Sequence, residues 1–187
     1  MSSTACSAEP AASDGMAAAA AVPNAKATLI IGYGSPIRGD DALGPIVAER
    51  LQTRDLPEHI TVIARHILTP DLIPAILAAA RIILIDAQID GEPGAVYQHS
   101  LAPDPALASA MGHFLDPREL LTWVQQLYGH TPVVTLLSSP AVSFEYAYNS
   151  LTPSAEAAAR EIERQVLWLV GLNLNETDYL ETHDASR

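Results

Sequence analysis

The sequence has few of the residues that several classes of protein require. Among its 187 residues there is one cysteine, Cys6, and one lysine, Lys26. A single cysteine excludes a disulfide framework and a zinc site built from cysteines. Ten basic against 22 acidic residues give a formal charge of −12, whereas nucleic acids and anionic membranes are bound by clustered Lys and Arg. We therefore expect neither nucleic acid nor a membrane surface as a partner.

Long hydrophobic runs are also missing. No apolar run approaches the roughly 20 residues needed to cross a bilayer. The N-terminus has no basic start, and Glu9 and Asp14 interrupt it, so it does not resemble a secretory signal. We expect a cytoplasmic protein, and because 49% of the chain is hydrophobic, one that can bury a substantial core.

The two ends differ from the middle in composition. Residues 1–25 are rich in alanine, and no Leu, Ile, Val or aromatic residue precedes Val22, so this segment has too little apolar surface to offset its ordering entropy. We predict a disordered extension over 1–25, with Met16 as an alternative start. A single α/β domain is predicted over 26–172, followed by a flexible acidic tail over 173–187.

Within the domain, short apolar segments alternate with segments of helical spacing. Strands are predicted at residues 27–32, 60–64, 81–86, 94–101 and 133–137, and helices at 42–53, 71–80, 117–128 and 153–172. This alternation is typical of a mainly parallel sheet with helices on both faces. Ligands of such sheets bind beyond the carboxyl ends of the strands, so the loops that follow the strands are the first place to look for a site.

The loop after the first strand, GYGSPIRGDDALG at residues 32–44, combines glycines with two acids. It lacks the third glycine of the dinucleotide fingerprint. Gly34 and Gly39 have P-loop spacing, but Asp40 and Asp41 stand where that loop has Lys and a hydroxyl, and two carboxylates would repel a polyphosphate. The same pair of carboxylates in a glycine-rich loop suits a cation. In a purely structural interpretation, Asp40 caps the following helix and Asp41 lies in its first turn.

Other strand ends carry further candidate ligands. His66 follows the second predicted strand, Asp86 ends the third, and His113 precedes the helix at 117–128. Carboxylate and imidazole groups that converge on one crevice suit Zn²⁺ or Ni²⁺. For His66 a surface role is equally compatible with the sequence, and Asp86 is interpreted as a buried acceptor of loop amides.

Three segments together resemble the NiFe-hydrogenase maturation endopeptidases: the loop at 32–44, the IDA of residues 85–87 with GEPG at 91–94, and Gly112-His113 ahead of a helix. The resemblance covers about residues 27–160. It implies a five-stranded twisted α/β sheet flanked by helices, and an enzyme that removes a C-terminal extension from a hydrogenase large-subunit precursor after nickel insertion.

The resemblance also implies a ligand set for that nickel, which the substrate protein would supply. Asp41, His66 and His113 are the implied ligands, with Asp71 as an alternative to His66 because many relatives have Asp at the middle position. Ser35 stands where the family commonly has Asn. Asp40 and Asp41 are the predicted catalytic acids, with Asp40 shaping the loop by holding backbone N–H groups. We expect a monomer without an organic cofactor.

Two alternatives stay open at this point. The chain could be a non-catalytic chaperone or binding module that senses the metallated large subunit, which the loss of an acid at the middle position favours. It could also be a metal-dependent hydrolase of small molecules on the same fold. A Ser hydrolase is disfavoured because no Gly-x-Ser-x-Gly elbow occurs, and a thiol nucleophile because Cys6 lies in the predicted extension.

Overall fold

A computed structural model of the chain describes residues 27–107 and 116–172. The predicted extension at 1–25, the predicted tail at 173–187 and the candidate ligand His113 lie outside the described residues. Within these residues, no helix is both long enough and apolar enough to span a bilayer.

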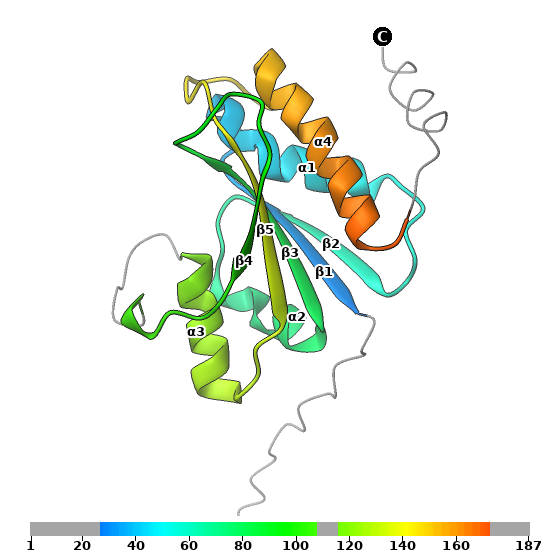
Figure 1. The fold of residues 1–187 in the computed structure, drawn as a ribbon, viewed down its shortest axis with the longest axis vertical. Helices are drawn as coiled ribbons and strands as arrows, with labels where there is room; N and C mark the ends of the chain where they lie inside the picture. The colour runs from blue at the N-terminus through cyan, green and yellow to red at the C-terminus, as the bar shows by residue number, and fades with distance from the viewer. Residues whose placement is uncertain (1–26, 108–115, 173–187) are drawn as a thin grey trace, which may run out of the picture.

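Strands and helices alternate along the described chain (Figure 1). The strands are β1 (Thr28–Tyr33), β2 (Ile60–Arg65), β3 (Arg81–Gln88), β4 (Tyr97–Leu101) and β5 (Val133–Pro140). The helices are α1 (Leu43–Gln52), α2 (Ile73–Ala78), α3 (Pro117–Tyr128) and α4 (Pro153–Leu169), and the short 3-10 helices are η1 (Gly39–Ala42), η2 (Pro70–Leu72) and η3 (Pro105–Leu107).

The strands form one sheet in the order β2-β1-β3-β5-β4. β1 pairs in parallel with β2 and β3, and β3 pairs in parallel with β5, whereas β4 runs antiparallel to β5. The predicted fold class, a five-stranded and mainly parallel sheet between helices, is confirmed. The carboxyl ends of β1, β2, β3 and β5 consequently meet at one edge of the sheet.

Side chains of the central strands alternate between two apolar cores. Ile30 of β1 and Ile83 of β3 pack with α1 and α4 on one face, whereas Leu29 of β1 and Ile82 of β3 pack with α2 and α3 on the other. Figure 1 shows these helix pairs on opposite sides of the sheet. Because a strand buried on both faces needs apolar residues at every position, this arrangement accounts for the continuous apolar runs of β1 and β3.

The close approach of α1 to the sheet depends on glycine. A Cβ on Gly44, in the first turn of α1, would lie 2.3 Å from the Tyr33 carbonyl oxygen and 2.4 Å from that of Ile85. Any side chain at this position would push α1 away from the ends of β1 and β3. The glycine therefore holds the loop between β1 and α1 directly over the carboxyl edge of the sheet.

Several elements differ from their predicted bounds. The predicted helix at 71–80 begins as η2 and continues as the short α2, which ends at Ala78 because Ala79 is extended (φ −93°, ψ 140°) and leads into β3. The predicted strand at 94–101 starts only at Tyr97, because Gly91 and Gly94 adopt positive φ values in the preceding turn. β3 and β5 are longer than predicted because they pair with each other up to Gln88 and Pro140.

Candidate functional site

A pocket of about 530 Å³ opens at the carboxyl ends of β1, β2 and β3. Its lining comes from the loop after β1, the segment after β2 and the end of β3: Tyr33, Gly34, Ser35, Arg38, Asp41, His66, Ile67, Leu68 and Asp86. This is the edge of the sheet at which ligands of open α/β folds bind. The sequence-based expectation that the strand-end loops form the site is consistent with this position.

The loop after β1 fixes the carboxylate of Asp41 at the pocket. The backbone N–H of Ser35 donates to Asp41 Oδ2 over 3.1 Å. Gly34 has φ 139°, and a Cβ there would lie 2.0 Å from the Asp41 carbonyl oxygen, so only glycine allows the loop to fold back this tightly. The Arg38 guanidinium lies 3.9 Å from Asp41 Oδ2 and is largely exposed. The Asp41 side chain retains 21% exposure, so it is accessible to a ligand.

Asp40 is fully buried and does not line the pocket. Its carboxylate accepts hydrogen bonds from the backbone N–H groups of Val142, Ser143 and Thr152 at 2.7–3.1 Å, and from the Thr152 hydroxyl at 2.9 Å. Asp40 therefore ties the loop after β1 to the segment that connects β5 with α4. This arrangement is what a loop-shaping role requires, and the catalytic role of Asp40 stays a prediction.

Asp86, at the end of β3, is the second carboxylate of the pocket. Burial raises its pKa to about 7, and the negative charge of Asp41 adds to the rise, although hydrogen bonds from the Tyr33 hydroxyl and the Ala87 N–H oppose it. The same surroundings raise the pKa of Tyr33, mainly through burial and then through the charge of Asp86. The pocket thus holds two carboxyl groups, and the pKa of one of them is raised toward neutrality, which is an arrangement common at functional sites.

Of the other candidate ligands, His66 lies at the pocket and Asp71 does not. His66 is exposed just after β2 and lines the pocket together with Asp41 and Asp86. Asp71 lies in η2, is exposed, and accepts a hydrogen bond from the Thr69 hydroxyl. The geometry therefore favours His66 over Asp71 at the pocket, while its role as a ligand stays a prediction. The structure does not test His113.

The donor set of the pocket is compatible with a divalent cation. Two carboxylates and an imidazole are ligands that nickel and zinc accept. A cation would oppose the rise in the Asp86 pKa that burial and, to a smaller extent, the charge of Asp41 produce. Within residues 27–107 and 116–172, however, no three His, Cys, Asp or Glu side chains stand close enough to form a metal cluster. The described part of the pocket therefore offers separate donors that do not by themselves form a metal cluster.

Asp86 has a larger part in the pocket than the sequence pattern alone indicates. Its interpretation as a buried acceptor of loop amides is partly right, because its Oδ1 accepts from the Ala87 N–H at 2.8 Å. Its side chain also lines the pocket with Asp41. The signal was present in the sequence: an acid at the end of a buried central strand lies at the carboxyl edge of the sheet. Only the tertiary structure shows that Asp86 faces Asp41.

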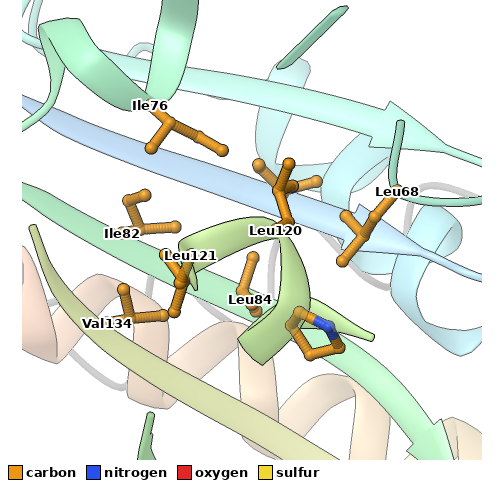
Figure 2. Close-up of a pocket in the computed structure, with 9 residues that line it drawn as sticks. Leu68, Ile76, Ile82, Leu84, Leu120, Leu121 and Val134 are labelled. Atoms are coloured by element: carbon orange, nitrogen blue, oxygen red, sulfur yellow. The ribbon is translucent and has the colours of Figure 1, made fainter. Parts of the chain in front are cut away.

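A second, very small cavity of about 10 Å³ lies beneath α3 in the apolar core. Figure 2 shows its lining, which includes Leu120 and Leu121 of α3, Ile76 of α2 and Val134 of β5. The lining is almost wholly apolar, so the cavity has no partners for an ordered water molecule. Leu68 lines both this cavity and the pocket, so the packing of α3 supports one wall of the candidate site.

Comparison with known proteins gives matches by structure alone, since no family model and no curated protein matches the sequence. A hydrogenase 2 maturation peptidase from a Thaumarchaeota archaeon superposes with a TM-score of 0.59 at 25% identity, over 79% of this chain and 99% of the peptidase. The NiFe hydrogenase maturation protease HycI from Thermococcus kodakarensis superposes with a TM-score of 0.62 at 20% identity, over 78% of this chain and 93% of the protease. The hydrogenase maturating endopeptidase HybD from Escherichia coli superposes with a TM-score of 0.62 at 23% identity, over 77% of this chain and 91% of the endopeptidase.

Proposed function

We propose that this chain, which belongs to the hydrogenase maturation protease family, is an endopeptidase that removes the C-terminal extension of a NiFe-hydrogenase large-subunit precursor. The observation that carries the proposal is the position of Asp41 and Asp86 in one pocket at the carboxyl edge of the family's fold. The similarity spans nearly the full length of the maturation peptidases to which the chain was compared, so the whole enzyme, and not one subdomain, is the unit of comparison.

We further propose that nickel reaches the pocket inside the precursor, as part of the substrate. Asp41, Asp86 and His66 supply carboxylate and imidazole donors on this side, and the predicted ligand His113 would complete the set. A metal ion in this position supplies Lewis acidity that polarises a peptide carbonyl or a water molecule. Nickel thereby serves as the signal that the precursor is ready to be cut.

The chain's own residues prepare the pocket for that cation. The Ser35 N–H and the folded loop hold the Asp41 carboxylate in place before the cation arrives. The pKa of Asp86, raised to about 7 by burial and by Asp41, lets the empty pocket keep a proton on the second acid. A cation would displace this proton, because a nearby positive charge favours the ionised carboxylate.

The competing hypothesis is a chaperone that binds the metallated precursor without cutting it. The exposed His66, which stands where many relatives have an acid, is the feature that favours a chaperone. Mass spectrometry of the nickel-loaded precursor, incubated with and without this protein, separates the two hypotheses. We expect the loss of a discrete C-terminal peptide only when the protein is present. An unchanged precursor mass, together with stable complex formation, would establish the chaperone instead.

A further inference from the structure

The loop between β5 and α4 carries exposed aromatic side chains, and one of them, Phe144, lies against the pocket residue Arg38. We define the aromatic rim as Ile37, Arg38, Phe144, Tyr146 and Tyr148. Tyr146 is 83% exposed and Tyr148 69%, and Ile37 and Phe144 are also exposed. Single exposed apolar residues are ordinary, but several of them on two joined loops next to a pocket indicate a binding surface.

Backbone contacts join the rim to the pocket loop. The Ala147 N–H donates to the Ile37 carbonyl, and the Asn149 N–H donates to that of Pro36, while Arg38 and Ala147 form an isolated parallel bridge. Arg38 itself lines the pocket, and its guanidinium lies 5.3 Å from the centre of the Phe144 ring. A partner that covers the rim would therefore also cover the mouth of the pocket.

The rim is held in place by the buried Asp40. Its carboxylate accepts from the N–H groups of Val142 and Ser143, at the start of the rim loop, and from Thr152, at its end. A loop fixed in this way loses less conformational entropy when a partner binds, so its exposed tyrosines are preorganised for contact. Tyr and Arg are also the residues enriched at the energetic centres of protein interfaces.

The charges indicate which partner fits. The pocket presents the carboxylates of Asp41 and Asp86. The rim presents apolar side chains and the guanidinium of Arg38, and the exposed acid Glu145 lies between Phe144 and Tyr146 in the same loop. The Arg38–Asp41 separation of 3.9 Å is too long for a hydrogen bond, so the guanidinium can donate to a carboxylate of a partner. A partner surface that complements this chain has a cation at its centre, which meets the pocket carboxylates. Around that cation it has apolar side chains and an acid, which meet the rim.

We infer that the aromatic rim is the docking surface for the folded, nickel-loaded large-subunit precursor, and that it seats the precursor's nickel over Asp41 and Asp86. This inference rests on the proposed function. Because recognition of a folded protein would occur partly at the rim, the pocket itself would not need to read the sequence of the extension. The rim would thus contribute mainly to substrate affinity, and the pocket to cleavage.

The test combines Tyr146→Ser with Tyr148→Ser in the full chain and uses Tyr128→Ser as the matched control. Tyr128 is also exposed but lies at the end of α3, next to the amino-terminal end of β5 and away from the pocket. Precursor binding and precursor cleavage are measured separately. We expect the double variant to raise both the dissociation constant and KM for the nickel-loaded precursor by about tenfold or more, with kcat within about twofold of the wild type. The control should match the wild type.

Unchanged binding and KM in a double variant that keeps the wild-type circular dichroism spectrum and Tm would overturn the docking inference, even if cleavage itself is confirmed. A wild type that binds but does not cleave would overturn the protease, and the binding data would still decide about the rim. If the double variant only converts a dimer of this chain into a monomer, with unchanged precursor binding, the rim is a self-association surface and the inference is wrong.

Discussion

The carboxylates of Asp41, in η1 after β1, and Asp86, near the end of the neighbouring strand β3, reach the same pocket, and the charge of Asp41 adds to burial in raising the pKa of Asp86. The two acids are 45 positions apart in the sequence but are brought together by the parallel pairing of β1 and β3. Like charges at one site are costly unless a proton or a cation compensates them. We therefore expect the charge of the pocket to depend on pH, and we propose that a divalent ion compensates the two carboxylates.

Replacement of Asp86 by Asn should change how stability depends on pH. Because burial raises the folded-state pKa of Asp86 from its ordinary value of 3.8 to about 7, the folded protein keeps the proton that the unfolded chain releases. The contribution of this protonated carboxyl to the stability of the wild type is therefore lost as pH rises through about 7. Relative to the wild type, Asp86→Asn should gain roughly 2 to 3 kcal/mol in unfolding free energy between pH 5 and pH 8. Urea denaturation at both pH values measures this gain.

Asp90→Asn serves as the control for that experiment. Asp90 is exposed, and it lies just beyond the end of β3. Its substitution should leave the pH dependence of unfolding as it is in the wild type. If Asp86→Asn follows the wild-type pH profile as closely as Asp90→Asn does, then Asp86 does not titrate near neutrality in the folded protein.

Asp40→Ala should destabilise the protein strongly. The substitution leaves the N–H groups of Val142, Ser143 and Thr152 without the buried carboxylate that accepts from them. We expect a loss of about 3 to 5 kcal/mol in unfolding free energy, because several hydrogen bonds to one ionisable group are lost together. The same variant should increase amide hydrogen exchange in residues 142–152. A loss below about 1 kcal/mol, the range of a surface ion pair, would contradict the structural role of Asp40.

Leu121→Ala should enlarge the small cavity beneath α3 (Figure 2). Leu121 is buried against the sheet, so the substitution removes apolar contacts and leaves a void, at a cost of about 2 to 5 kcal/mol. Leu127→Ala, on the same helix but 70% exposed, should cost less than about 0.5 kcal/mol. Equal effects on Tm for the two variants would show that α3 does not pack as described.

Much of the fold could be predicted because local patterns decide it. The apolar runs of β1 and β3 predict strands buried on both faces, and Asp116 with Pro117 sets the start of α3, where the Asp116 side chain accepts from the Arg118 N–H. The bounds of α2 could not be predicted, because the turn of the chain into β3 at Ala79 depends on tertiary packing. Propensity alone favours a longer helix there.

The site could be predicted only in part, for a similar reason. The glycines and acids of the loop at 32–44 indicate a binding loop, and its position at the carboxyl edge follows from strand order. Which of the two adjacent acids turns inward is a matter of loop geometry: Asp40 is buried among backbone donors, whereas Asp41 lines the pocket. The contribution of Asp86 depends on a long-range pairing that no local pattern contains.

The most direct measurement is the rate at which the nickel-loaded precursor loses its C-terminal peptide, followed by intact-mass spectrometry with wild type, Asp41→Asn and Asp71→Asn. Asp71 is the matched control because it is exposed and lies outside the pocket lining. We predict that the wild type and Asp71→Asn cleave at similar rates, that Asp41→Asn is slower by about 100-fold or more, and that nickel-free precursor stays intact. Wild-type cleavage by Asp41→Asn, or equal cleavage without nickel, would contradict the proposal.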